Sequence, residues 1–258
     1  MRRRRFLQAL TAGVTGAIAG CLSGTDSTTP QPEATAPTPA TGTPASAATG
    51  VGEPELPVPL TEMRHTLPRD YIPAITDPAF AEDWRGLEAP VEDPTLPGET
   101  PVLGVQRDDR ARAYPLRVLN HHEIVNDDFA GPIAVTYCVL CGTGVVVERR
   151  VAGEPTVFGV SGKLWRSDLV MYDRSTESLW SQLMATAIRG ERTGDQLTIL
   201  PSTLTTWAEW RRTHPATRVL LPPPHSTAIS EYDREFDYFA PAYGYGEETQ
   251  LIGLDSFD

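Results

Sequence analysis

The stretch that decides the fold is residues 133–148, with the sequence IAVTYCVLCGTGVVVE. Residues 133–137 and 145–148 are β-branched and apolar runs, a composition typical of buried strands. The Cys-Gly-Thr-Gly segment between the runs favours a turn. The stretch therefore predicts a hairpin whose tip carries the Cys-x-x-Cys pair formed by Cys138 and Cys141.

Similar short runs on both sides of this hairpin predict further strands. They occupy residues 102–105, 156–160, 169–172 and 197–200. Gly, Pro and Asp clusters separate the runs at spacings that suit antiparallel hairpins. Residues 115–122 and 204–213 predict two short helices. We therefore expect a mainly β (α+β) fold, an antiparallel sheet or barrel-like domain with a few short helices, and no doubly wound parallel sheet.

The first twenty residues predict a signal peptide. Four arginines, Arg2 to Arg5, precede Phe6 and Leu7, and no acidic residue follows before Cys21. The paired arginines fall on the spacing of a twin-arginine signal, and residues 18–21 read Ile-Ala-Gly-Cys, which resembles a lipobox. The apolar segment is too short to favour a spanning helix. We expect export through the twin-arginine pathway and anchoring to the outer face of the cytoplasmic membrane by a lipid on Cys21.

The composition predicts a stalk followed by one domain. Residues 21–57 are rich in Thr, Pro, Ala, Ser and Gly, and such a segment buries too little apolar surface to offset its ordering entropy. We expect it to be a disordered tether. Residues 58–258, about 200 residues, fall within the size range of a single globular domain.

The charge of the chain indicates adaptation to salt. The formal net charge is −12, and removal of Arg2 to Arg5 would leave 18 basic against 34 acidic residues, a charge of −16. Lys163 is the single lysine. Acidic excess with so little lysine is typical of halophilic proteins, whose surface charge aids solvation. So acidic a chain is an improbable partner for nucleic acid.

The chemistry of the chain centres on Cys138 and Cys141, because lipidation of Cys21 would leave them as the remaining thiols. Outside the cell such a pair can be a disulfide, a redox couple or half of a metal site. In thioredoxin-like proteins the pair opens a helix, whereas here turn and strand follow it. That context favours a knuckle in which both sulfurs face one metal ion.

A complete metal site needs further ligands, and histidine is the obvious source because the chain has no second Cys-x-x-Cys. His121 and His122 lie ahead of the hairpin, and thiolates with imidazole suit copper, zinc or iron. Met171 could add a thioether if the metal is copper. Glu123 and Asn120 are expected to act around the ligands, orienting an imidazole or relaying a proton.

Other residues offer weaker candidates. Asp168 and Asp173 could be paired acids, but on so acidic a chain ordinary surface carboxylates are the favoured interpretation. The segment around Lys163 lacks the glycine spacing of a phosphate loop, and no nucleotide cofactor is expected.

Two segments resemble the family catalogued as domain of unknown function 3179: residues 120–127, NHHEIVND, and residues 136–143, TYCVLCGT. Shorter matches follow, among them Ser167-Asp168-Leu169, Met171-Tyr172-Asp173 and the sequence ESLWSQ at residues 177–182. The similarity covers roughly residues 70 to 220 and implies no activity. Relatives usually have Trp at the position of His121 and Pro at that of Val139, which makes His122 the better ligand. The family includes selenoprotein forms, which implies redox or metal chemistry at a thiol position.

We therefore expect a lipid-anchored protein whose Cys138, Cys141 and His122 bind a soft transition metal in a redox or metal-handling role, with an exported redox or metal partner. Two alternatives remain. One is metal-free thiol–disulfide exchange, in which the more exposed cysteine attacks and the other resolves. The other is a non-catalytic binding module with a structural disulfide. The sequence leaves open the substrate, the oligomeric state and whether the protein is an enzyme.

Overall fold

The computed structural model describes residues 54–87, 94–229, 232 and 234–240. All of them belong to one unit of the chain, Gly52–Asp258. The predicted signal peptide, Cys21 and the stalk as far as residue 53 lie outside the described residues. Within the described part, no helix is both long and apolar enough to cross a membrane.

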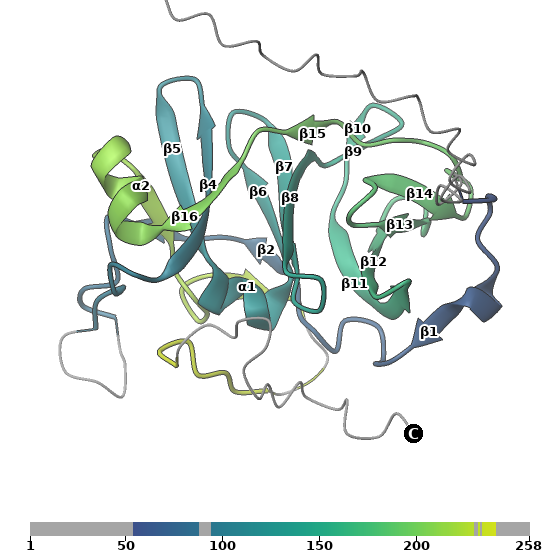
Figure 1. The fold of residues 1–258 in the computed structure, drawn as a ribbon, viewed down its shortest axis with the longest axis horizontal. Helices are drawn as coiled ribbons and strands as arrows, with labels where there is room; N and C mark the ends of the chain where they lie inside the picture. The colour runs from purple at the N-terminus through teal and green to yellow at the C-terminus, as the bar shows by residue number, and fades with distance from the viewer. Residues whose placement is uncertain (1–53, 88–93, 230–231, 233, 241–258) are drawn as a thin grey trace, which may run out of the picture. The chain divides into compact units, whose positions relative to one another are not determined.

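The described residues form three larger sheets, a short ribbon and a few helices (Figure 1). The central sheet has the spatial order β15 (Ile199–Leu200), β8 (Thr143–Glu148), β7 (Pro132–Cys138), β6 (Ile124–Asp128), β2 (Ile75–Asp77) and β18 (Thr227–Ala228). The β4 sheet has the order β16 (Thr203–Thr206), β4 (Pro101–Arg107), β5 (Arg110–Pro115), β17 (Arg218–Leu220) and β3 (Phe80–Ala81). The β12 sheet has the order β1 (Met63–His65), β11 (Phe158–Trp165), β12 (Asp168–Asp173), β13 (Leu179–Ser181) and β14 (Thr186–Arg189). The ribbon pairs β9 (Arg150–Val151) with β10 (Glu154–Pro155), and the helices are η1 (Leu60–Glu62), α1 (Leu116–His122) and α2 (Trp207–Thr213).

These sheets confirm the mainly β prediction. Nearly all neighbouring strands are antiparallel, and the parallel pairs are β17 with β5 and β2 with β6. Each sheet has two free ends in its strand order, so the sheets are open and do not close into a barrel.

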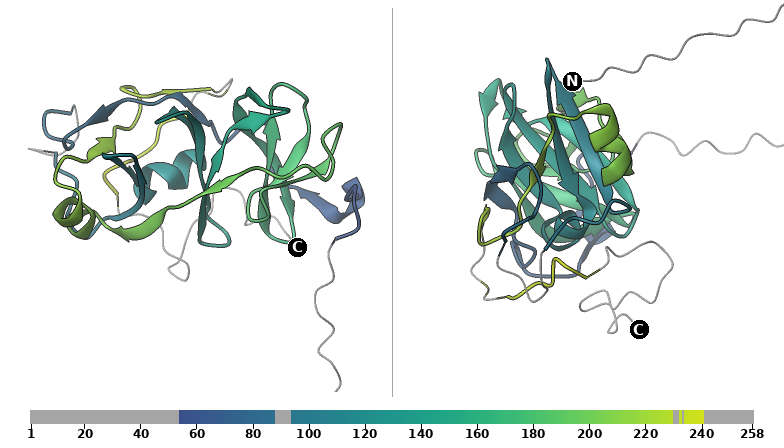
Figure 2. Two further views of the ribbon diagram at one scale, coloured as in Figure 1. Left: turned by 90° about the horizontal axis from the view of Figure 1, so that it is seen from above. Right: turned by 90° about the vertical axis from the view of Figure 1, so that its left-hand side faces the viewer.

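Strand β7 explains why the central sheet lies between the other two. Successive side chains of a strand point to opposite faces, so a strand that is apolar at nearly every position is buried on both. Ile133, Val135 and Tyr137 belong to the core shared with the β4 sheet. Ala134 and Cys138 belong to the core shared with the β12 sheet. The three layers can be followed from a second direction in Figure 2.

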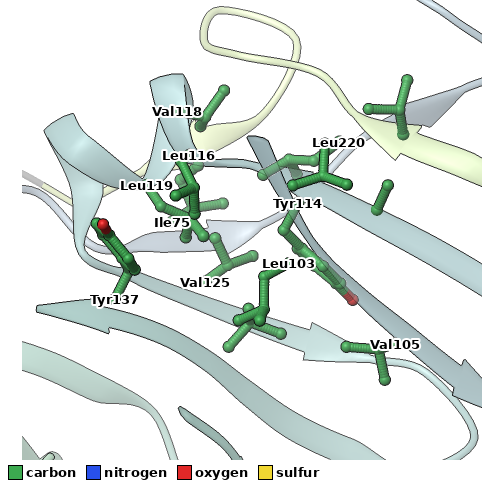
Figure 3. Packing of buried hydrophobic residues seen from close by; sticks show 14 of the residues in the cluster. Ile75, Leu103, Val105, Tyr114, Leu116, Val118, Leu119, Val125, Tyr137 and Leu220 are labelled. Atoms are coloured by element: carbon green, nitrogen blue, oxygen red, sulfur yellow. The ribbon is translucent and has the colours of Figure 1, made fainter. Parts of the chain in front are cut away.

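The first core joins the central sheet, the β4 sheet and α1 (Figure 3). Leu103 of β4 and Tyr114 of β5 meet Val125 of β6, and Leu119 of α1 covers the same cluster. All four side chains are almost completely withdrawn from solvent. This packing holds α1 against both sheets, and β6 of the central sheet begins at Ile124, directly after the cap of the helix at Glu123.

The second core joins the central sheet to the β12 sheet. Phe158, Met171 and Trp180 pack there with Cys138. Asn126 of β6 ties the two sheets together by hydrogen bonds, because its Nδ2 donates to the Phe158 carbonyl at 2.9 Å and its Oδ1 accepts from the Phe158 N–H at 2.8 Å. These bonds hold β6 against β11.

The two predicted α-helices are present, and each begins later than the sequence predicts. The sequence predicts α1 over residues 115–122, and the helix begins one residue later, at Leu116, with Pro115 as its N-cap and the last residue of β5. The sequence predicts α2 from residue 204, whereas the helix begins at Trp207, and Thr206 caps it by accepting the N–H of Glu209. Residues Thr203–Thr206 instead form β16, because pairing with β4 satisfies their backbone groups.

Candidate redox and metal site

The Cys-x-x-Cys pair lies at the tip of the β7–β8 hairpin, as the sequence predicts. Cys138 ends β7 and pairs with Thr143, the first residue of β8. Gly142 turns the chain with φ of 61°, a backbone conformation that glycine adopts without a Cβ penalty. Cys138 and Cys141 are joined by a disulfide, and their Cα atoms are 5.6 Å apart.

The two cysteines differ in exposure. Cys138 is only 1% exposed and faces the second core, whereas Cys141 is half-buried in the turn. The N–H of Cys141 donates to Cys138 Sγ at 3.4 Å, and the Ser167 carbonyl oxygen lies 3.7 Å from the same sulfur. Solvent therefore reaches the pair mainly through Cys141.

Asp168, the first residue of β12, lies beside both sulfurs. One carboxylate oxygen of Asp168 and the sulfurs of Cys138 and Cys141 all lie within 4.8 Å of one another. The Ser181 hydroxyl donates a hydrogen bond to this carboxylate at 2.5 Å, and the Leu183 N–H donates another at 3.2 Å. Burial raises the pKa of Asp168, although these hydrogen bonds oppose the rise. The three side chains could hold a metal ion, and in this structure the sulfurs form a disulfide.

Glu123 is a second buried acid near the site. It caps α1 with φ of 54°, and its own N–H donates to the Leu119 carbonyl while its carbonyl accepts the N–H of Tyr137. Burial raises the pKa of Glu123 from 4.5 to about 8, and the charge of Asp168 adds to the rise. Because desolvation disfavours the charged form, Glu123 carries a proton at neutral pH.

A hydrogen-bond network links the hairpin to the β12 sheet. Gln182, completely buried, donates through Nε2 to the Thr136 hydroxyl at 3.0 Å and to the Thr143 carbonyl at 3.2 Å. The Thr143 hydroxyl lies 3.2 Å from Cys141 Sγ and 3.4 Å from Gln182 Oε1. The network fixes the turn against the strand end that supplies Asp168.

His122 does not take the predicted place, and this is the main correction at the site. Its Nδ1 lies 2.6 Å from the Pro73 carbonyl oxygen and its Nε2 lies 2.8 Å from the Tyr238 hydroxyl. Both ring nitrogens are therefore occupied away from the sulfurs. Burial lowers the pKa of His122 to about 4, so the ring is neutral and serves as a packed, hydrogen-bonded core residue.

The other predicted residues are dispersed. The ring of His121 packs against Phe236 at 4.9 Å, and burial lowers the pKa of His121. Asn120 precedes it on α1 and is half-buried. Met171 is buried in the same core as Cys138, on the strand that begins with Asp168, and its role as a copper ligand stays a prediction.

The family of the chain is shown by comparison with known proteins. The family described as "Protein of unknown function (DUF3179)" matches residues 69–255. The chain belongs to the DUF3179 family. No curated protein and no solved structure matches the chain.

In this DUF3179 member, the candidate site residue that the sequence analysis set aside is Asp168. Asp168 is 7% exposed and Asp173 is fully buried, so neither is the surface carboxylate that composition favoured. The sequence does carry a signal of their burial: the two acids are the first and last residues of a strand that is apolar at every position between them. Acids at the ends of a strand buried on both faces have little access to solvent.

Proposed function

We propose that the protein is an exported, lipid-anchored thiol–disulfide redox protein whose reactive pair is Cys138 and Cys141. The observation that carries the proposal is the position of their disulfide: it closes a hairpin tip, beside a buried carboxylate and with one of the two cysteines only partly buried. Perturbed acids next to a reactive group are characteristic of functional sites.

A purely structural role accounts less well for this bond. A disulfide stabilises mainly by restricting the unfolded chain, and the gain grows with the length of the closed loop. Cys138 and Cys141 are three residues apart, and backbone pairing of β7 with β8 already holds the tip. The bond therefore contributes little to the stability of the fold. A disulfide of this kind can open and close during a redox reaction while the domain stays folded.

The proposed reaction transfers two electrons. Two thiols of an exported partner, or one dithiol, are oxidised to a disulfide while the Cys138–Cys141 bond is reduced to two thiols, or the reverse. The partner supplies the protons and electrons that the pair gains. Export is supported by the arginine pair and lipobox of the N-terminus, and disulfides persist in compartments outside the cytoplasm.

The test is a redox titration of the folded, full-length chain carrying Cys21→Ser, in molar salt. We expect reversible opening of the pair with a potential above about −300 mV, the value below which structural disulfides lie. The double variant Cys138→Ser and Cys141→Ser is the control and should show no titration. A bond that opens only when the chain is unfolded would contradict the proposal.

A second candidate function is metal binding by the reduced pair, favoured by the convergence of Cys138, Cys141 and Asp168. Two thiolates and a carboxylate suit a soft or borderline ion such as zinc, copper or iron, with a position left for an external ligand.

Reduced protein titrated with Zn²⁺ or Cu⁺ tests this second candidate. We expect stoichiometric binding that is lost in Cys138→Ser and weakened in Asp168→Asn. His122→Ala is the matched control and should bind as the wild type does, because its ring nitrogens bond Pro73 and Tyr238. A loss of affinity in His122→Ala equal to that in Asp168→Asn would contradict this ligand set.

A further inference from the structure

We propose that Cys141 Sγ is the atom that exchanges with partner thiols and that Cys138 is the resolving cysteine, with Thr143 positioning the exchanging sulfur. This assignment rests on the proposed redox function and goes one step further, because it gives each cysteine a different role. It also means that the second cysteine of the Cys-x-x-Cys pair, not the first, is the one that reacts with the partner.

Access distinguishes the two sulfurs. A thiolate attacks a disulfide sulfur along the S–S axis, so the attacked atom must be reachable from solvent. Cys138 is 1% exposed, at the end of β7, where its side chain packs in the second core. Cys141 is half-buried and belongs to the turn. Cys141 packs against the edge of the second core but is only partly buried, so it is the cysteine of the pair that a partner thiol reaches more readily.

The backbone is arranged to receive the leaving group. When a partner thiolate bonds to Cys141 Sγ, the S–S bond breaks and its electron pair leaves on Cys138 Sγ. The N–H of Cys141 already donates to that sulfur at 3.4 Å, and a donor to an anion forms a stronger hydrogen bond than a donor to a neutral group. A second partner thiolate then attacks the partner sulfur of the mixed disulfide and releases Cys141 as a thiolate.

Thr143 is placed to donate a hydrogen bond to the Cys141 thiolate that this second step releases. Its hydroxyl has one hydrogen and two neighbours, Cys141 Sγ at 3.2 Å and Gln182 Oε1 at 3.4 Å. In the disulfide state the amide oxygen is the better acceptor, so the hydroxyl donates to Gln182. After reduction the Cys141 thiolate is the stronger acceptor, and a rotation about the Thr143 side chain moves the hydrogen bond to the sulfur.

The first experiment compares two full-length variants that also carry Cys21→Ser. Cys138→Ser leaves Cys141 as the free thiol, and Cys141→Ser leaves Cys138. We expect dithiodipyridine to react at least about tenfold faster with Cys138→Ser, because thiol exchange depends on access to the sulfur. Equal rates, or faster reaction of Cys141→Ser, would overturn the assignment.

A second experiment uses the intact pair and does not depend on the folding of a variant. Oxidised protein with Cys21→Ser is mixed with cysteamine, quenched in acid and mapped by peptide mass spectrometry. An adduct on Cys141 is expected, and an adduct on Cys138 refutes the assignment while leaving the redox function intact. A pair that cysteamine and dithiols cannot open while the chain is folded removes both proposals together.

The role of Thr143 has its own test, in the Cys138→Ser background. Thr143→Val removes the hydroxyl, and Thr143→Ser retains it. We expect Thr143→Val to slow the reaction of Cys141 with dithiodipyridine several-fold and Thr143→Ser to restore it, because hydrogen bonding favours the thiolate form. A Thr143→Ser variant as slow as Thr143→Val would show that the methyl packing matters and not the hydroxyl.

Discussion

Glu123 shows how strongly its surroundings can change a single side chain. The sequence suggests a polar residue that orients a histidine, but the carboxyl group is buried where α1 meets β6, close enough to Asp168 for the two charges to interact. Burial, with the repulsion of Asp168, raises the pKa of Glu123 from 4.5 to about 8.

This shift predicts a pH dependence of stability. Between about pH 4.5 and pH 8 the folded chain keeps the Glu123 proton and the unfolded chain releases it, so the contribution of Glu123 to stability falls as pH rises. Below about pH 6.5 the lowered pKa of His122 acts in the opposite direction, so we expect the net fall between about pH 6.5 and pH 8. Each pKa unit corresponds to about 1.4 kcal/mol, so the loss over this window is about 2 kcal/mol. Denaturant unfolding across this range measures it.

Glu123→Gln should remove most of this slope, because the amide stays neutral at every pH in the range. The exposed Glu154→Gln is the matched control and should leave the slope unchanged. A Glu123→Gln protein with the wild-type slope would show that the carboxyl group is not the source.

At the scale of elements, β11 illustrates how a glycine permits close packing. The pairing of β11 with β12 shifts register between Val160 and Lys163, and Gly162 lies in this bulge with φ of +73°. The N–H groups of Thr66 and Leu67 donate to its carbonyl, which brings the Leu67 backbone against the position of a Cβ. Only a residue without a side chain fits there.

Two glycines allow the contribution of this contact to be separated from backbone strain. Gly153 has a similar φ of +84°, but a Cβ there would meet nothing within 4 Å. Gly153→Ala should cost about 1 kcal/mol of stability from left-handed strain alone. Gly162→Ala should cost roughly 2 kcal/mol more, because its Cβ would overlap the Leu67 carbonyl oxygen. Equal unfolding midpoints of the two variants would refute the close approach.

At the scale of the whole molecule, charge is the dominant property. The formal charge is −12 for the full-length chain and would be −16 without Arg2 to Arg5, and such self-repulsion opposes the compact state when it is unscreened. Salt at 1 M shortens the screening length to about 3 Å. We expect the unfolding midpoint of the full-length chain to rise with KCl or NaCl, measured by thermal unfolding from dilute buffer to molar salt. An unchanged midpoint would contradict the halophilic interpretation.

Much of the fold could be predicted because it is locally encoded. The hairpin of β7 and β8 follows from two apolar runs and a glycine turn, and α1 follows from Pro115 and the helical segment after it. Helix α2 shows the limit, because Thr203–Thr206 became a strand through its pairing with β4, a segment about a hundred residues earlier in the chain. Pairing over such distances leaves no mark on the local pattern.

The sequence alone determined the mainly β class, the family resemblance and the cysteine pair at a hairpin tip, because each depends on residues close together in the chain. The tertiary structure alone decided which residues join that pair. His122 is turned toward Pro73 and Tyr238, whereas Asp168 reaches the sulfurs because the β12 sheet packs on the face of β7 that carries Cys138. The apolar pattern of β7 shows that both of its faces are buried. Because the hydrophobic effect is non-directional, the pattern does not specify which apolar surface covers each face. Which sheet covers which face, and with it the composition of the site, is set by the packing of the whole domain.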